Sequence, residues 1–137
     1  MVSRLLILSA FSFLLLFACS TKKSRVLSFE YGGHFDTSCA ILEGEVYEPN
    51  LNTNSKDSLL SVSNAIIKAI DSSNNQVYKT DYTDSRGRFS MSFFNNDTYD
   101  LVVTKSGYQT IRITNFIADS GQTSTVKIIL EKEQKIF

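Results

Sequence analysis

Cys39 and His34 are the residues best suited by type to nucleophilic catalysis, because a thiol can attack once a nearby imidazole removes its proton. The chain contains one His and two Cys, and His34 stands beside Gly32 and Gly33 in a segment that we interpret as a linker. A linker does not hold a base against a nucleophile, so we expect no catalytic pair. Cys39 is instead expected to begin the first strand as a small, buried and inert thiol. An intermolecular disulfide at Cys39 is the alternative.

Metal and phosphate sites are not indicated by the sequence. One His and two Cys are too few for an ordinary zinc site of Cys and His ligands. The pairs Asp97/Asp100 and Asp81/Asp84 lack the alternating oxygen ligands around a central Gly that a calcium loop needs. No Gly-rich loop stands between a strand and a helix to hold a phosphate. We therefore predict no metal and no cofactor.

Two aromatic residues are candidates for binding a ligand or partner. Tyr47 is expected to point outward from its strand, and Phe94 lies on the opposite face from Phe93. Exposed rings of this kind can stack on a sugar or contact a protein. The alternative is that they are covered by a long Asn-rich loop, Glu48 to Ser61.

The overall charge excludes a nucleic-acid partner. The chain has 14 Lys and Arg against 14 Asp and Glu, so no net field attracts a polyanion. Hydrophobic residues make up 42% of the 137 residues, an ordinary content that excludes low-complexity disorder. These values predict a small globular domain.

The first 18 residues have the character of a secretion signal. An apolar run from Leu5 to Ala18 follows one Arg, and it is shorter than the ~18–20 residues that span a bilayer as a helix. The run ends in Leu16-Phe17-Ala18-Cys19, which resembles the bacterial lipobox. In proteins with this motif the Cys is diacylated on sulfur and signal peptidase II cuts before it. The motif therefore predicts a lipid anchor at Cys19; an ordinary secretory signal with an incidental Cys is the alternative.

The residues after Cys19 indicate the destination. By resemblance to lipoproteins of double-membraned bacteria, Ser20 directs the chain to the outer membrane, and the basic segment Thr21-Lys22-Lys23-Ser24 lacks the acidic run that some lineages use for surface display. We expect a lipid-anchored protein facing the periplasm.

Residues 19–38 are expected to be the lipidated Cys and a tether. Thr21 to Ser38 shows no clear structural period, and as a flexible chain it would span ~20–25 Å. Leu27, Phe29 and Tyr31 alternate with polar residues, so a short accessory strand within the tether is an alternative.

From Cys39 onward the pattern predicts β-strands. Leu42, Gly44 and Val46 lie on one face of the first strand, and Glu43, Glu45 and Tyr47 lie on the other. Similar segments recur every ~10–12 residues with tight turns between them, which is typical of an antiparallel β-sandwich. The seven expected strands cover residues 42–47, 65–70, 78–83, 88–93, 99–104, 108–114 and 126–131. We expect the sandwich to occupy residues 39–132, followed by a tail at 133–137.

Several residue groups follow one another in a set order along these strands. They are Leu42, Gly44 and Val46; Ala65-Ile66-Ile67; Thr83-Asp84-Ser85-Arg86-Gly87-Arg88-Phe89; Tyr99, Leu101 and Val103; and Gly107-Tyr108. Their order resembles the carboxypeptidase regulatory-like domain, a seven-stranded Greek-key sandwich of the prealbumin, or transthyretin-like, type. The resemblance implies no catalysis, since this module accompanies peptidases, receptors or adhesins and is not itself the active part.

The same residues have structural roles that we can predict. Asp84 is expected to cap its turn, Gly87 to adopt a positive φ, and Phe89 to anchor the core. Tyr99 is expected to act as a corner tyrosine, with a buried ring and a hydroxyl bonded to the backbone.

Two functional hypotheses follow. The first is a non-catalytic, membrane-anchored lipoprotein that presents an interaction module as an accessory subunit of a bacterial envelope assembly. The second is a carbohydrate-binding lipoprotein that uses Tyr47, Phe94 and the Glu48 to Ser61 loop; the absence of Trp counts against it. The expected partners are membrane lipid through Cys19 and an unidentified envelope protein or glycan.

Overall fold

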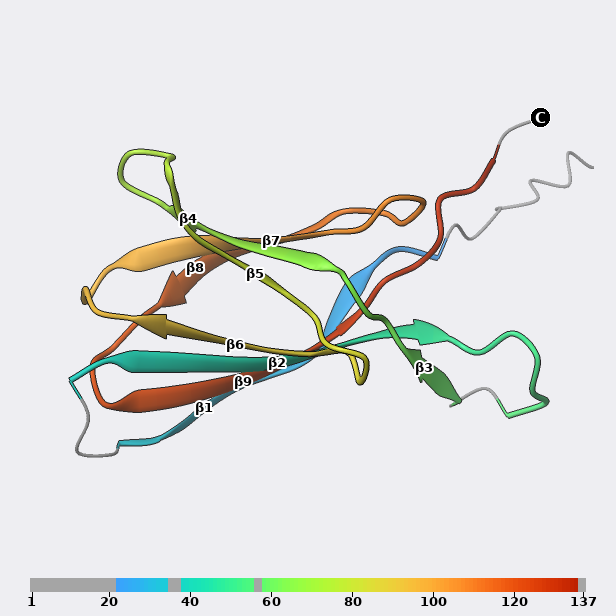
Figure 1. The fold of residues 1–137 in the computed structure, drawn as a ribbon, viewed down its shortest axis with the longest axis horizontal. Coiled ribbons are helices and arrows are strands. Elements are labelled where there is room, and N and C mark those ends of the chain that lie inside the picture. Colours follow the sequence, from blue (N-terminus) through green and yellow to red (C-terminus); the bar gives the residue numbers. More distant parts are fainter. Residues whose placement is uncertain (1–21, 35–37, 56–57, 136–137) are drawn as a thin grey trace, which may run out of the picture.

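Two packed β-sheets make up the part of the chain that the computed structural model describes, residues 22–34, 38–55 and 58–135 (Figure 1). This part contains nine strands and no helix. The strands are β1 (Arg25–His34), β2 (Ala40–Pro49), β3 (Leu59–Ser61), β4 (Ile66–Asp71), β5 (Val77–Tyr82), β6 (Arg88–Phe93), β7 (Thr98–Thr104), β8 (Ile111–Ile117) and β9 (Gln122–Ile129). The predicted signal segment, residues 1–18, and Cys19 lie outside the described residues.

The first sheet has β2 at its centre. Its order is β1-β9-β2, and the other side of β2 pairs with β6 along its first part and with β3 at its end. The second sheet has the order β5-β4-β7-β8. Strand neighbours are antiparallel except for β2 and β9, which run parallel. The predicted all-β sandwich is confirmed.

The strand count differs from the seven expected, and the two additional strands are β1 and β3. β3 pairs its three residues with the end of β2, within the segment expected to be a loop. β1 lies within the expected tether and pairs with β9 over ten residues, further than the accessory strand that the local alternation allowed. The Phe29 ring also attaches β1 to the core, because it packs on Phe116 with 5.8 Å between the ring centroids.

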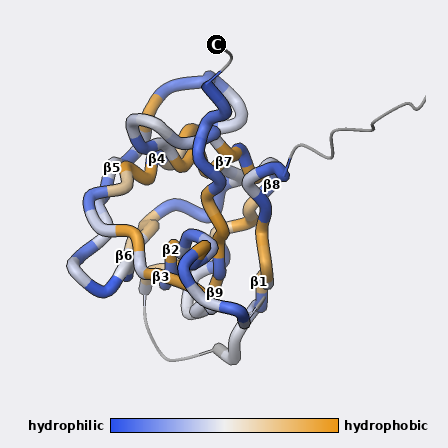
Figure 2. The backbone as a smooth tube through the Cα atoms, turned by 90° about the vertical axis from the view of Figure 1, so that its right-hand side faces the viewer, coloured by the Kyte–Doolittle hydropathy of each residue, from blue (hydrophilic) through white to orange (hydrophobic). Residues whose placement is uncertain are grey.

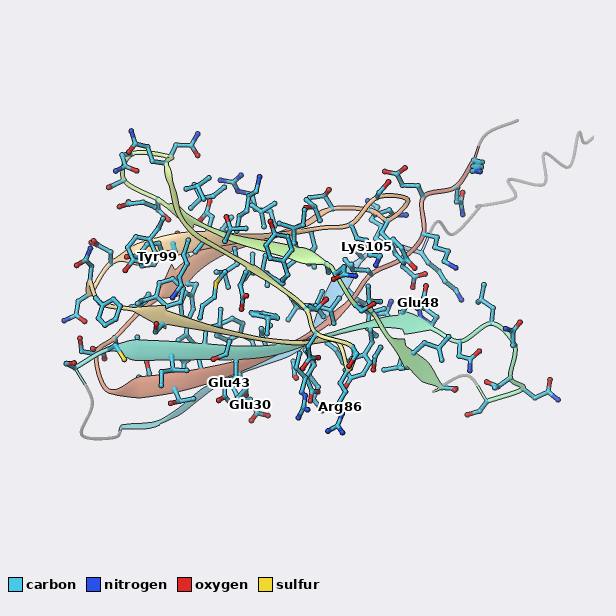
Figure 3. All side chains as sticks on the ribbon, in the orientation of Figure 1. Glu30, Glu43, Glu48, Arg86, Tyr99 and Lys105 are labelled. Atoms are coloured by element: carbon cyan, nitrogen blue, oxygen red, sulfur yellow. The ribbon has the colours of Figure 1, made fainter. Side chains whose placement is uncertain are left out.

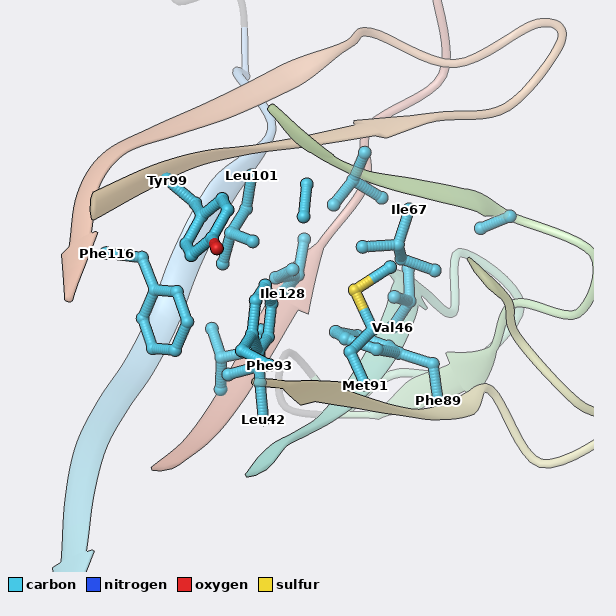
Figure 4. Close-up of a cluster of buried hydrophobic side chains, with 14 of the residues drawn as sticks. Leu42, Val46, Ile67, Phe89, Met91, Phe93, Tyr99, Leu101, Phe116 and Ile128 are labelled. Atoms are coloured by element: carbon cyan, nitrogen blue, oxygen red, sulfur yellow. The ribbon is translucent and has the colours of Figure 1, made fainter. Parts of the chain in front are cut away.

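A single hydrophobic core fills the space between the sheets (Figure 4). Figure 2 shows hydrophobic positions along the strands and hydrophilic ones in the turns that connect them. One end of the core is aromatic: Phe93 lies 4.8 Å from Tyr99 and 5.3 Å from Phe116 between ring centroids. The largest fully buried side chains are Tyr99, Phe93, Phe116, Leu42, Ile67, Met91, Leu101, Ile128, Leu130, Val46, Val103 and Val126.

The turn between β5 and β6 confirms the predicted structural roles. The Asp84 carboxylate accepts hydrogen bonds from the backbone N–H groups of Arg86 (2.8 Å) and Arg88 (2.9 Å). The bond from Arg88 is the main reason that the pKa of Asp84 lies below its ordinary value. Gly87 has a φ of +74°, and Phe89 is buried. These residues build the turn.

Tyr99 differs from the prediction in its hydroxyl group. The ring is fully buried, but among the described residues the hydroxyl finds no hydrogen-bond partner. Burial raises the pKa of Tyr99 to about 12. The interpretation of Tyr99 as a hydrogen-bonded corner tyrosine was wrong.

Candidate functional site

The outer face of the first sheet carries a hollow of about 770 Å³ that is open to solvent. We call it the outer hollow. Its floor comes from β1, β9, β2 and β6, and its rim from the end of β5 and the following turn. Because inward and outward side chains alternate along each strand, its lining is the polar half of strands whose other half forms the core.

Strand register arranges the floor in two rows that run across four strands. One row contains Ser28, Lys127, Glu45 and Arg88, and the other contains Glu30, Thr125, Glu43 and Ser90. Side chains opposite one another in neighbouring strands are close enough to interact. The charge on the floor of the hollow is therefore set by the side chains of these two rows.

The first row compensates its own charges. The Lys127 ammonium lies 3.6 Å from a carboxylate oxygen of Glu45, and the Tyr47 hydroxyl donates a 2.8 Å hydrogen bond to the same oxygen. That bond is the main reason that the pKa of Tyr47 is raised. Arg88 lies 3.9 Å from the Asp84 carboxylate. Lys127 is thus compensated by the Glu45 carboxylate, and Arg88 by the Asp84 carboxylate of the neighbouring turn.

The second row carries uncompensated negative charge. Glu30 and Glu43 are both exposed and both stand opposite Thr125; they point away from the core in Figure 3. Two strand spacings separate their backbones, about 10 Å. Neither forms an ion pair with any residue that the structure describes. The row is an anionic strip with room for a cationic group between its two carboxylates.

The rim adds a third carboxylate and an aromatic ring. Asp81 accepts hydrogen bonds from the backbone N–H groups of Tyr82 (2.8 Å) and of Ser90 (3.2 Å), and the second bond joins the end of β5 to β6. Tyr82 lines the hollow and is 58% exposed. A carboxylate strip beside an exposed aromatic ring can bind a cationic side chain through ion pairing and ring contact.

Sequence reasoning did not identify this surface. The polar face of β2, with Glu43 and Glu45, was a local signal, but it did not show what stood opposite. In the sequence, Tyr82 alternates in step with Tyr78, whose ring stacks on Phe93. A register shift at Tyr78 breaks that alternation, so Tyr82 pairs with Ile66 on the face opposite to the buried Ile67 and is exposed for that reason.

The structure does not bring the two predicted contact residues together. Tyr47 lies on the outer face of β2 as expected, but it is half-buried and its hydroxyl is bonded to Glu45. Phe94 is 68% exposed and follows Phe93, the partner of Ala40 at the start of β2. Seven residues of strand, about 23 Å, separate Ala40 from Tyr47. One small ligand cannot contact both rings.

The remaining residues considered for catalysis are Cys39 and His34. Cys39 stands one residue before β2 and is partly exposed, not buried as expected; the side chain of His34 lies outside what the structure describes. Among the described residues, no three His, Cys, Asp or Glu side chains are grouped so that they could hold a metal ion. This part of the chain also has no helix with the length and apolar character needed to cross a membrane.

Comparison with known proteins identifies the family. No curated protein matches the chain. The model of the carboxypeptidase regulatory-like domain matches residues 55–131, which is more than half of the 137 residues and includes the Thr83 to Phe89 turn. β1 and β2 precede the matched range, so Glu30 and Glu43 come from outside it. The family is non-catalytic. The chain belongs to the carboxypeptidase regulatory-like domain family.

Proposed function

We propose that this protein is a non-catalytic, lipid-anchored lipoprotein whose outer hollow docks a protein partner, as an accessory subunit of a bacterial envelope assembly. The observation that carries the proposal is the strip formed by Glu30 and Glu43 in an open hollow. Two carboxylates without ion-pair partners among the described residues favour a partner that supplies Lys or Arg side chains.

Charge and shape both support a protein partner. Complementary charge accelerates encounter and fixes orientation more than it raises affinity. A stable interface buries about 800 Å² on each partner, and the four-strand outer face around the hollow offers a continuous polar surface for it. Membership of a non-catalytic family is consistent with a role in binding.

The lipid anchor is part of the proposal and depends on Leu16-Phe17-Ala18-Cys19. Two or more acyl chains give stable anchoring, whereas one chain gives only marginal binding. Ser20 after the Cys supports the outer membrane, and the basic residues that follow support its periplasmic face.

Cross-linking in cells tests this proposal. The native lipoprotein is cross-linked in its own cells and captured proteins are identified by mass spectrometry, with Cys19→Ser as the unanchored control. We expect one dominant envelope protein, absent from the control. Absence of any specific protein, with the anchor confirmed by mass, would reject the accessory-subunit role.

Glycan binding is the second candidate, and the exposed Tyr82 ring beside the carboxylates favours it. A sugar can stack on the ring while its hydroxyls donate hydrogen bonds to the acids. This function predicts measurable affinity in a polysaccharide screen and its loss in Tyr82→Ala. A screen without binding would leave the protein partner as the remaining proposal.

A further inference from the structure

The first described residues of the chain are fastened to the sandwich. The Gln109 side-chain amide donates a 3.0 Å hydrogen bond to the Lys22 carbonyl, and the Ser24 hydroxyl donates one of 2.9 Å to the Gln109 carbonyl. The backbone N–H of Glu131 in turn donates to the Ser24 hydroxyl at 2.9 Å. The described chain is therefore bonded to the sandwich from Lys22 onward.

This attachment leaves little chain between the fold and the proposed lipid anchor. Three residue steps separate Cys19 from Lys22, and they reach at most about 11 Å. A tether of residues 19–38 would have let the domain move freely above the headgroups. With only three steps, a lipid anchor at Cys19 would place this end of the sandwich at the membrane surface.

That end, which we call the basal end, is suited to an anionic surface. Five of its described residues are exposed cations, namely Lys22, Lys23, Arg25, Lys132 and Lys135. Two of its acidic groups are paired: Glu131 lies 3.4 Å from Arg25, and Glu48 lies 3.6 Å from Lys132. Glu133 is an exposed carboxylate here, so the cations remain in excess.

The basal end also exposes an apolar side chain. Leu51 is 81% exposed and lines a shallow hollow of about 200 Å³ together with Leu60 and Lys132. Figure 1 shows the loop after β2 and both ends of the described chain on the same side of the molecule. An exposed Leu beside several Lys is the combination that binds the interfacial region of a bilayer.

We infer that the basal end rests on an anionic phospholipid surface, with Leu51 inserted among the headgroups and the exposed lysines against the lipid phosphates. The inference rests on the proposed lipidation of Cys19. It orients the molecule with the Phe94 end away from the membrane, because β2 runs from that end towards the basal end.

Tryptophan reporters test the orientation. The chain contains no Trp, so Leu51→Trp and the matched control Phe94→Trp each introduce one ring at an exposed apolar position. Each full-length lipidated variant is reconstituted in vesicles of phosphatidylethanolamine and phosphatidylglycerol with brominated acyl chains. We expect quenching at position 51 to be at least threefold stronger than at position 94. The quenching should fall when Lys22→Glu and Lys23→Glu are added.

Mass spectrometry of the same preparations distinguishes failure of the lipid anchor from failure of the basal-end contact. A lipidated protein with equal quenching at positions 51 and 94, or quenching that the charge reversals leave unchanged, overturns the basal-end contact and leaves the anchor intact. A protein without acyl mass on Cys19 overturns the anchor and this inference with it. Circular dichroism of each variant confirms that the reporters compare folded proteins.

Discussion

Gly44 and Phe89 form a cross-strand pair in which the missing side chain of one makes room for the ring of the other. They stand opposite each other in β2 and β6. A Cβ atom at Gly44 would lie 2.1 Å from a ring carbon of Phe89. The small residue at this position is thus a packing requirement of the core.

Gly44→Ala should therefore destabilise the fold by about 1–3 kcal/mol, the usual cost of an overpacked core. Gly33→Ala is the matched control, since a Cβ there meets no atom within 4 Å and the change should stay within about 0.5 kcal/mol. Urea unfolding measures both. Equal effects at the two glycines would contradict the packing account.

The buried Tyr99 and the partly buried Tyr108 lead to opposite predictions for removal of the hydroxyl group. Tyr108 donates a 2.8 Å hydrogen bond to Glu48, whereas the Tyr99 hydroxyl has no partner among the described residues. Tyr108→Phe should lower the free energy of unfolding by about 1 kcal/mol, and Tyr99→Phe should leave it unchanged or raise it. Denaturant titration of the two variants tests this prediction. A larger loss of unfolding free energy for Tyr99→Phe than for Tyr108→Phe would show that the Tyr99 hydroxyl has a hydrogen-bond partner.

The same tyrosines predict sensitivity to alkali. Burial is the main cause that raises the pKa of both Tyr99 and Tyr108 to about 12, from 10.0. Between these values the unfolded chain has lost protons that the folded chain retains, so stability falls as pH rises from 10 to 12. Thermal unfolding across this range should show the fall, with a smaller slope in Tyr99→Phe. An unchanged slope would mean that Tyr99 titrates normally.

Among the strands, β1 is the one that local sequence patterns predicted least well. Its alternation at residues 27–31 was visible, but its partner β9 is about a hundred residues away along the chain, and no local pattern shows such a contact. A bulge between Val26 and Ser28 also places Leu27 outside the inward period of Phe29.

Phe29 should be the residue that holds β1 on the sandwich. Phe29→Ala removes the contact with Phe116 and should cost about 2 kcal/mol for a partly buried ring. Tyr31→Ala, at a ring that is 51% exposed, should cost less than about 1 kcal/mol. Hydrogen exchange of β9 amides should accelerate in the first variant alone. Similar exchange in both would mean that β1 contributes little as a strand.

The strands with internal alternation and tight turns were predictable for a physical reason: both signals are local. Asp84 and Gly87 are residue types typical of a tight turn, and the alternation of apolar and polar residues indicates the inward faces of β6 and β7. The outer hollow was not predictable, since its two rows depend on the register of β1, β9, β2 and β6. Register between distant strands is fixed by packing across the whole sandwich.

At the scale of the whole molecule, charge is separated although the formal net charge is zero. The basal end exposes cations, and the outer hollow carries the anionic strip of Glu30 and Glu43. This separation would let one molecule bind an anionic membrane at its base and a cationic partner on its side. The account therefore joins anchor, orientation and docking surface in one arrangement.

Site-specific photo-cross-linking tests whether the proposed partner docks in the outer hollow. A photoreactive residue replaces Tyr82 at the rim or Asn95 in the exposed turn after β6, in the full lipoprotein in its own cells. Each is combined with Glu43→Lys or with the matched charge reversal Asp97→Lys, which lies outside the hollow lining. The account predicts one cross-linked protein from position 82, lost in Glu43→Lys and retained in Asp97→Lys. A cross-link from position 95 alone, or one that survives Glu43→Lys, would contradict it.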